Sequence, residues 1–322
     1  MLRFENKIMR GSRGIMRNRS SRIFALALLA LAGVFSAGVP GLQAANLRPA
    51  ATKAFERYVQ AAEARMAREG RQPGDFLYIE QLPKPQYDQV MSMLKQGQVY
   101  VTRLQTLDAA GKAINVPGGM IHHWTGDVFI PGTSLTSAFK ALRNYNNYKE
   151  IYKPQIVRSR LVSRHGDDYK IYLRLQKSSI VTVTLDTWYD IRFSQIDATQ
   201  GYTRSFSTRI QQVEDAGMPS EHRDPVGNDS GYLWRINSYW RYEQVQGGMI
   251  IEWESISLSR PIPFLLAWFV KPLIRNIARE TVADMLTATR KAVLAEKAQQ
   301  DQAKTSGRSR GRKASPEGTG AK

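Results

Sequence analysis

The sequence contains no cysteine among its 322 residues. This absence excludes disulfide bonds and a lipid-modified N-terminal cysteine, and it is compatible with an oxidising compartment. Histidine is scarce, with four copies. His122 and His123 are adjacent on an expected strand, so their side chains point to opposite faces and cannot easily coordinate one metal ion together. No metal site is predicted from this set.

Common catalytic and nucleotide-binding motifs are missing as well. The chain has no phosphate loop, dinucleotide glycine fingerprint, His-Glu-x-x-His zinc motif or Gly-x-Ser-x-Gly elbow. Ser230 lies in a glycine-flanked loop without a paired base, which is typical of a turn residue. The sequence therefore predicts no catalytic residue and no cofactor.

The first 44 residues have the order of a secretory signal. Seven basic residues precede or adjoin an apolar run over 23–39, and Pro40, Gly41 and a small residue at Ala44 follow. We predict a signal peptide over 1–44 and a periplasmic or secreted protein. The alternative is an inner-membrane anchor formed by an uncleaved 23–39, because this run is about as long as the shortest membrane spans.

The charge is strongly positive, with a formal net value of +18. Part of it lies in the leader and part in residues 297–322, whose Gly, Ser, Lys and Arg content predicts a disordered basic tail. The remaining positive charge suits peripheral contact with an anionic membrane. Nucleic acid is not expected as a partner behind a secretion signal.

Helix and strand patterns divide the rest of the chain. Apolar spacing predicts a helix over 49–69 and a second one over 85–95, which together form an N-terminal helical extension over 45–98. Two strands (99–107, 120–130), a helix capped by Thr133 or Ser134, four more strands and a polar loop follow. Hairpin-like connections between the strands indicate an antiparallel sheet.

The C-terminal third determines the fold class. Strands over 234–246 and 249–258 are joined by Gly247-Gly248, and a long amphipathic helix follows Pro272. Its broad apolar face can lie across a sheet. We predict an α+β fold in which a curved antiparallel sheet wraps around a long C-terminal helix.

This order resembles the helix-grip fold of START-type lipid-transfer domains and of the SRPBCC superfamily, which includes polyketide cyclases. The segments 138–163 and 238–279 carry the resemblance, which covers about 99–293. We therefore expect a START-like domain over 99–296. The resemblance implies a cavity between the sheet and the terminal helix.

Two strand faces are expected to line that cavity. Alternation places one set of aromatic and aliphatic side chains under the terminal helix: Val183, Leu185, Tyr189, Ile191, Trp234, Trp240 and Tyr242. The alternative is that these side chains only pack as core. The predicted ligand is a lipid or another hydrophobic small molecule.

Three charged residues fall on the same two C-terminal strands: Arg241, Glu252 and Glu254. An acid beside an arginine in an apolar cleft could contact a ligand head group. Paired carboxylates could instead serve acid–base catalysis, or form a cross-strand ion pair at the sheet surface.

The apolar segment 261–271 could form the mouth of the cavity or pack inward. The function predicted from these features is binding or transfer of a hydrophobic molecule. The alternative is a cyclase- or hydrolase-type enzyme on the same fold, and a third possibility is a structural protein with a filled core.

Overall fold

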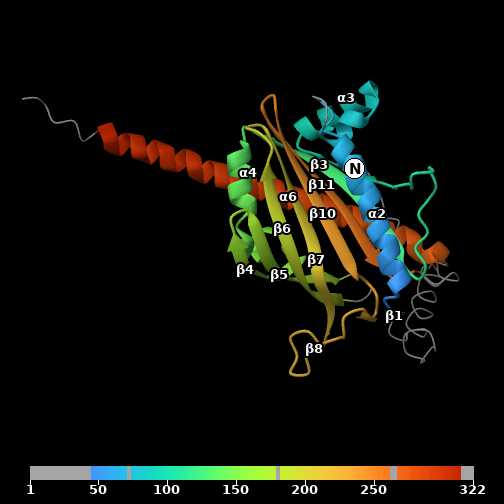
Figure 1. Ribbon diagram of the computed structural model, residues 1–322. Coiled ribbons are helices and arrows are strands. Elements are labelled where there is room, and N and C mark those ends of the chain that lie inside the picture. Colours follow the sequence, from blue (N-terminus) through green and yellow to red (C-terminus); the bar gives the residue numbers. More distant parts are fainter. Residues whose placement is uncertain (1–44, 71–73, 179–181, 262–266, 313–322) are drawn as a thin grey trace, which may run out of the picture. The chain divides into compact units, whose positions relative to one another are not determined.

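The computed structural model describes residues 45–70, 74–178, 182–261 and 267–312. Its centre is an antiparallel sheet of nine strands in the order β2-β3-β11-β10-β7-β6-β5-β4, with β8 paired to β7 (Figure 1). The strands are β2 (Val99–Arg103), β3 (Met120–Pro131), β4 (Ile156–His165), β5 (Asp168–Ser178), β6 (Thr182–Gln195), β7 (Gln200–Glu214), β8 (His222–Arg223), β10 (Arg235–Val245) and β11 (Gly248–Ser259). The short strands β1 (Ala45–Asn46) and β9 (Asn228–Asp229) form a separate pair.

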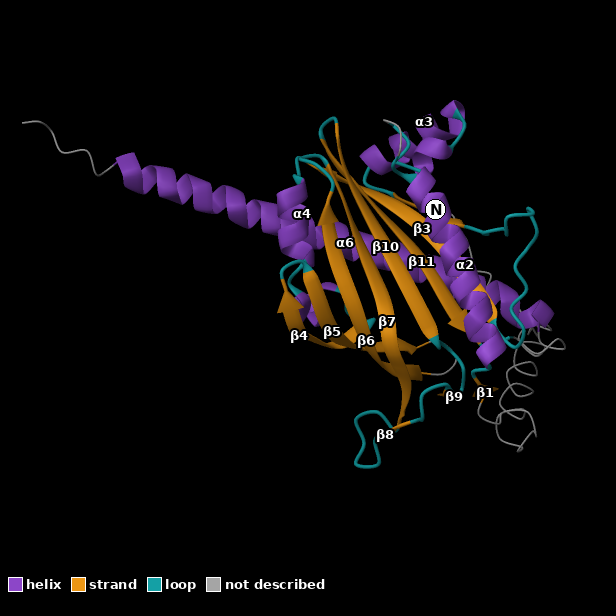
Figure 2. Cartoon of the chain, in the orientation of Figure 1, coloured by secondary structure: helices purple, strands orange, loops and turns teal. Residues whose placement is uncertain are grey.

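Helices lie on both faces of this sheet (Figure 2). They are α2 (Pro49–Arg68), η1 (Tyr78–Gln81), α3 (Lys84–Lys95), α4 (Leu135–Leu142), η2 (Tyr145–Asn147), α5 (Tyr148–Ile151) and α6 (Ala267–Arg312). Helix α6 crosses one face, which we call the inner face. Helix α2 lies on the opposite, outer face.

Strand alternation sorts the core between these two faces. On β11, Ile251 and Trp253 belong to the core cluster that contains Val282 and Leu286 of α6. Further along β11, Ile256 and Leu258 fall on the alternate positions and pack in a second cluster with Ala51, Phe55 and Tyr58 of α2. One strand therefore supplies side chains to both helices because successive residues point to opposite faces.

Helix α6 approaches the sheet closely at Gly126 of β3. A Cβ atom at this position would lie 2.8 Å from Leu286 Cδ1 and 3.0 Å from Val282 Cγ1. Such distances leave no room for a side chain, so glycine allows the helix to pack directly on the strand.

The fold class predicted from the sequence is confirmed, and so is the order of helices and strands. The expected strand boundaries hold within about four residues. The helix expected after Thr133 or Ser134 is α4, and Ser134 caps it by accepting a hydrogen bond from Ser137 N at 3.3 Å. Gly247 adopts the positive φ of 84° that the β10–β11 turn requires.

The predicted tail differs from the structure. Helix α6 continues to Arg312, so 297–312 is helical where composition predicts disorder. Ser137 of α4 donates to Gln300 near the start of this stretch, and an established helix extends from there by adding one hydrogen bond per residue.

Three predicted features lie wholly or partly outside the described residues: the signal peptide over 1–44, the apolar segment 261–271 at residues 262–266, and the tail at residues 313–322. No described helix is long and apolar enough to cross a membrane.

Candidate functional site

The inner face holds most of the side chains predicted to line a cavity. Tyr189, Ile191 and Tyr242 are buried in the cluster that packs against α6, and Trp240 lies half-buried beside it. Trp240 stacks on Trp253 of the neighbouring strand, with ring centroids 5.2 Å apart and an interplanar angle of 13°. The structure therefore brings these four predicted residues together.

Val183 and Leu185 lie on the same face by alternation, nearer the start of β6 than Tyr189 and Ile191. Leu185 is buried and pairs with Leu175 of β5, whereas Val183 is half-buried. They extend the inner face toward the start of β6.

Trp234 does not share this face, contrary to the prediction. It packs on the outer face with Tyr239, Ile256 and Leu258, and its Nε1 donates to Asp229 Oδ1 at 3.1 Å. Strand β10 begins one residue later, at Arg235, so the alternation of the strand does not extend to Trp234.

Buried aromatic rings fill the part of the inner face near α4. Phe139 of α4 makes edge-to-face contacts with Phe193 and Tyr242, at centroid distances of 5.2 and 5.1 Å. Tyr169 contacts Phe193 as well. This part is packed as a core and holds little surface for a ligand.

The part toward β3 is built differently. Ser238 pairs with Ser205 of β7 on one side and with Ser255 of β11 on the other, so three serines form a row across three strands. Half-buried Trp124, Ile236 and Trp240 surround this row. Small hydroxyl side chains on the floor and apolar side chains around it are the composition of a ligand site. Alternation predicts these inward serines, but sequence reasoning followed the large residues and missed them.

His122 is an ionisable group on this face. Burial lowers the pKa of His122 to about 4, and the charge of Arg103 adds to the effect. Its Nε2 lies 2.9 Å from Ser259 Oγ. The Ser259 hydroxyl also lies 3.1 Å from Arg260 O, to which it donates.

The three charged residues predicted to contact a ligand lie on the outer face. Arg241 pairs directly with Glu252, and its Nε donates to Glu252 Oε1 at 2.7 Å. Both carboxylates of Glu252 and Glu254 are fully buried beneath α2 and η1. The structure thus places all three on the face opposite α6, so they cannot contact a ligand that is held under α6. The cross-strand ion pair is present, although it is buried.

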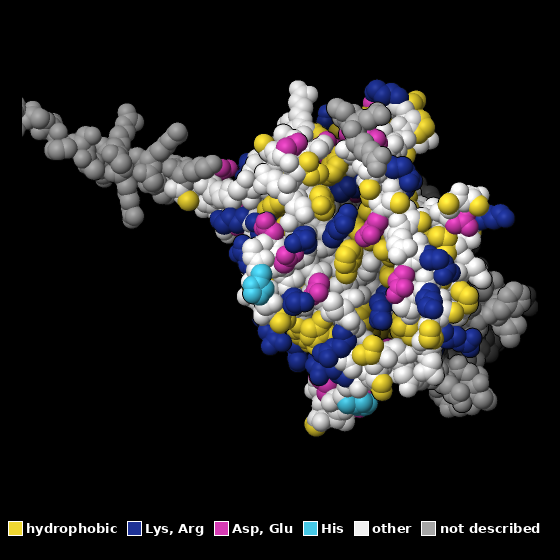
Figure 3. Space-filling model, viewed as in Figure 1, with side chains coloured by type: hydrophobic (Ala, Val, Ile, Leu, Met, Phe, Trp, Pro, Cys, Tyr) yellow, Lys and Arg dark blue, Asp and Glu magenta, His cyan; other side chains and the backbone are white. Residues whose placement is uncertain are grey.

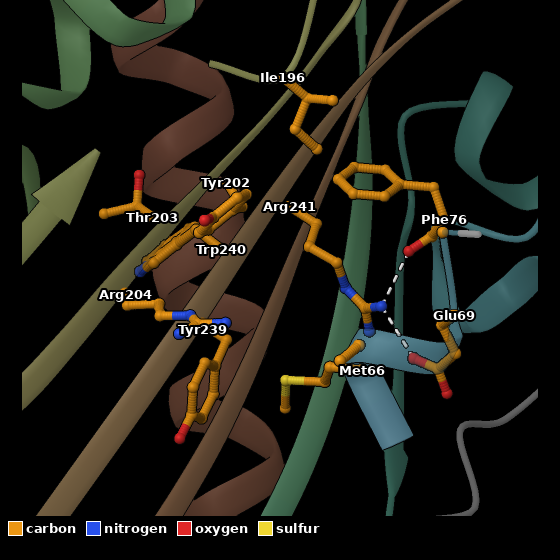
Figure 4. Close-up of a pocket in the computed structure, with 12 residues that line it drawn as sticks. Met66, Glu69, Phe76, Ile196, Tyr202, Thr203, Arg204, Tyr239, Trp240 and Arg241 are labelled. Carbon is orange, nitrogen blue, oxygen red and sulfur yellow. Dashed lines mark hydrogen bonds and ion pairs between the residues drawn. The ribbon is translucent and has the colours of Figure 1, made fainter. Parts of the chain in front are cut away.

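Helix α2 completes this ionic cluster. Arg65 bonds Glu69 and Glu254, and Glu69 also accepts a bond from Arg241 at 2.8 Å. His123 Nε2 contacts Glu254 Oε1 at 2.6 Å. The Arg241 Nη1 donates to Phe76 O as well, at 2.8 Å (Figure 4). Every charged partner is thus fixed by a hydrogen bond.

The pKa values divide the buried acids into two groups. Burial opposes ionisation of Glu254, but the hydrogen bond and charge of His123, together with Arg65 and Arg241, lower its pKa to about 2. Burial raises the pKa of Glu252 to about 7, although Arg241 opposes this. Burial, with the charge of Glu252 adding, raises the pKa of Asp127 well above its ordinary value. The surrounding cations therefore favour the charged form of Glu254, whereas burial favours the neutral form of Asp127.

A pocket opens on the outer face beside this cluster (Figure 4). It has a volume of about 200 Å³ and lies between the end of α2 and strands β7 and β10. Its lining includes Met66, Phe76, Tyr202, Arg204 and Tyr239. Pockets for drug-sized ligands measure roughly 300–1,000 Å³, so this one is small for a lipid.

No protein-family model and no curated protein matches the chain. Solved structures similar to it include a STAR-related lipid transfer protein from Xanthomonas axonopodis, with 16% identity over 60% of this chain and 96% of that one and a TM-score of 0.37. Human STARD10 is similar with 10% identity, over 69% and 84% of the two chains, at a TM-score of 0.39. The Zhui aromatase/cyclase from Streptomyces sp. R1128 shows 9% identity over 54% and 94%, at 0.36.

The chain has a helix-grip fold, in which the long C-terminal helix α6 crosses an antiparallel sheet. The START-type structures named above are similar to it in fold. Identities this low concern the fold alone, and folds of this kind host unrelated functions. The ligand and the activity must come from the residues of this chain.

Proposed function

We propose that this chain binds a hydrophobic small molecule or lipid between the inner face of the sheet and α6. The observation that carries the proposal is the contrast within the inner face. Its α4 end is filled by buried aromatic rings, whereas Trp124, Ile236 and Trp240 remain half-buried around a serine row. Half-buried apolar side chains on a covered face mark a place where a ligand can complete the packing.

Binding would be driven by removal of apolar surface from water, worth about 25 cal/mol per Å². The stacked pair of Trp240 and Trp253 offers a flat apolar wall. The row of Ser205, Ser238 and Ser255 offers hydroxyl groups that can donate to or accept from a polar group of the ligand. In this proposal the serines replace Arg241, Glu252 and Glu254 as the polar contacts.

An exported carrier in the periplasm or outside the cell is the setting that we propose. The basic and apolar order of residues 1–44 and the small residue at Ala44 support it. N-terminal sequencing of protein from the envelope fraction should begin near Ala45, and recovery of the intact leader in a membrane pellet would favour an anchor.

The first test fills the serine row. Ser238→Phe places an aromatic ring on the floor between Ser205 and Ser255. We expect its affinity for a neutral apolar fluorescent probe, N-phenyl-1-naphthylamine, to fall about tenfold or more, which corresponds to about 1.4 kcal/mol. Probe fluorescence titration measures the dissociation constant, and native mass spectrometry shows which molecules co-purify.

The matched control is Arg204→Phe, which adds an aromatic ring on the outer face at the edge of the other pocket. It should bind the probe as the wild type does. If Arg204→Phe lowers the affinity and Ser238→Phe does not, the ligand lies in the outer pocket and the proposal is wrong.

A further inference from the structure

A row of cationic and aromatic side chains crosses four strands on the outer face. Arg160 of β4 pairs with Tyr172 of β5, Tyr172 pairs with Trp188 of β6, and Trp188 pairs with Arg209 of β7. The Arg209 Cζ lies 3.6 Å from the centre of the Trp188 ring, and the Arg160 Cζ lies 5.8 Å from that of Tyr172. Each end of the row therefore holds a guanidinium group over an aromatic ring.

This row lies beyond the area that α2 covers. Helix α2 packs on residues of β10 and β11, including Tyr239, Ile256 and Leu258. Arg160 and Arg209 are exposed, as is Arg158 in the neighbouring row of β4. Figure 3 shows Lys and Arg side chains gathered over β4–β7 at the lower left. We call Arg158, Arg160, Tyr172, Trp188 and Arg209 the basic face.

Two exposed arginines of the basic face carry unbalanced charge. No ion pair joins Arg160 or Arg209 to a carboxylate of the described residues, whereas the charge of Arg158 acts on Glu221 and helps to lower its pKa. Other cations nearby are balanced: Lys170 pairs with Asp190, and Arg192 with Asp168. Two guanidinium groups without an acidic partner on one surface attract an anionic partner.

The row rests on a rigid base. Tyr172 donates its hydroxyl to Asp186 Oδ1 at 2.6 Å. Asp186 is fully buried and is held by Arg174 at 2.7 Å and by Arg223 at 2.6 Å. The aromatic rings are thus fixed, and they hold the guanidinium groups in place before any partner binds. This preorganisation lowers the entropy that is lost on binding.

We propose that the basic face docks on the surface of an anionic phospholipid membrane. Arginine, tryptophan and tyrosine are the side chains that suit the headgroup region, where cations meet phosphates and amphipathic rings are half solvated. Exposed valines lie next to the arginines on the edge strand β4: Val157 is 37% exposed and Val162 is 50% exposed. Apolar side chains beside cations match a lipid interface.

Nucleic acid fits the same face less well. Proteins that hold single strands stack bases on open aromatic faces. In the basic face, Arg209 already lies over the ring of Trp188 at 3.6 Å, and Arg223 lies 5.9 Å from the same ring. The ring therefore orients cations and offers little surface to a base.

The test compares two double variants of the full chain. Arg160→Gln with Arg209→Gln removes the two ends of the row. Lys95→Gln with Lys112→Gln makes the same change in net charge at exposed positions outside β4–β7. Both are mixed with vesicles of phosphatidylcholine, with and without phosphatidylglycerol, and the bound fraction is measured by sedimentation. Any contribution of residues 1–44 is common to all variants and cancels.

We expect the wild type to bind the vesicles that contain phosphatidylglycerol and to release them as salt is raised. The Arg160/Arg209 variant should bind about 25-fold more weakly, since each arginine near an anionic surface contributes about fivefold. The lysine variant should stay within about threefold of wild type. Circular dichroism and the melting temperature should be unchanged in both variants.

Two results would overturn the proposal. An equal loss in both double variants would mean that binding follows total charge and not this face. Binding of a labelled single-stranded oligonucleotide that depends on Arg160 and Arg209, together with vesicle binding that does not, would assign the face to nucleic acid. Probe binding at the inner face is measured separately, so its failure would not affect this outcome.

Discussion

The two faces of the sheet are both covered by a helix, yet they are held by different chemistry. Strands β10 and β11 supply both faces, with Trp240 and Trp253 on the inner side and Arg241 and Glu254 on the outer side. The contacts on the inner face are mainly apolar or join neutral groups, as between Thr203 and Tyr242, although Arg143 lies over the rings of Phe139 and Phe193 and Arg290 of α6 donates to Phe129 O. The outer face adds ion pairs between buried charges to its apolar contacts. The period of two along a strand keeps the two chemistries apart.

This difference has a consequence for the two helices. Removing α2 from the sheet would take Arg65 and Glu69 away from Glu254 and Arg241, and it would leave buried charges without their partners. Moving α6 would expose apolar side chains but would separate no charge pair of the described residues on the sheet. Among the described residues, the face without ion pairs between buried side chains is therefore the one at which we propose ligand binding.

The largest effect is expected where a charge is removed from the outer cluster. Arg241→Met keeps the length of the side chain but leaves Glu252 and Glu254 without their shared guanidinium group. We expect it to lower the free energy of unfolding by about 3–5 kcal/mol, because it breaks a buried ion pair from one side. Urea denaturation measures the change.

The control for this substitution is Arg204→Met on the neighbouring strand β7. Arg204 is exposed, and its described contact is with the ring of Tyr202 at 5.4 Å. Its free energy of unfolding should stay within about 0.5 kcal/mol of wild type. If Arg241→Met is as stable as this control, protons and not Arg241 neutralise the buried acids.

A second prediction uses pH to separate the two acids of β11. The pKa of Glu252 is about 7 in the folded chain, against an ordinary value of 4.5. The folded state keeps this proton where the unfolded chain has lost it, so stability falls as pH rises from about 4.5 to about 7. Glu252→Gln cannot ionise. Its stability relative to wild type should therefore rise by about 2–3 kcal/mol between pH 5 and pH 8.

Glu254→Gln is the matched control for this pH dependence. The pKa of Glu254 is about 2, so its contribution to stability is lost only as pH falls from about 4.5 toward 2. The difference from wild type should change less between pH 5 and pH 8 than it does for Glu252→Gln, because only the part of the Glu252 pKa shift that comes from the charge of Glu254 is lost. A change as large as that of Glu252→Gln would show that the two acids share their protons differently. Chemical denaturation at a series of pH values measures both variants.

Much of the fold could be predicted from the sequence because the strands and the terminal helix have strong periodicity. Alternation also placed Tyr189, Ile191, Trp240 and Tyr242 correctly under α6. Alternation failed at Trp234, because this residue lies one position before β10 begins and its side chain packs on the outer face. Strand ends are set by hydrogen bonds between distant segments, and a local pattern does not contain them.

The location of the charged residues could not be read from their own strands. Alternation shows that Glu252 and Glu254 share a face, but it does not show which face lies under α6. That depends on α2, whose Tyr58 and Arg65 come from a segment about 190 residues away from Glu254 and reach His123 and Glu254. The serine row was missed for a different reason, since small residues give little hydrophobic signal.

The smallest effect is expected for a neutral hydrogen bond on the inner face. Tyr152 OH lies 3.0 Å from Thr289 Oγ1 of α6, and both side chains are buried. Tyr152→Phe should cost about 1 kcal/mol, because one neutral hydrogen bond is lost. The double variant Tyr152→Phe with Thr289→Val should cost no more than the single one, since replacing both partners leaves no unpaired polar group. A double-mutant cycle by urea denaturation gives their coupling energy. A coupling energy as large as the loss of stability in Arg241→Met would mean that the inner face, too, depends on strong polar contacts. Helix α6 could then not move to make room for a ligand.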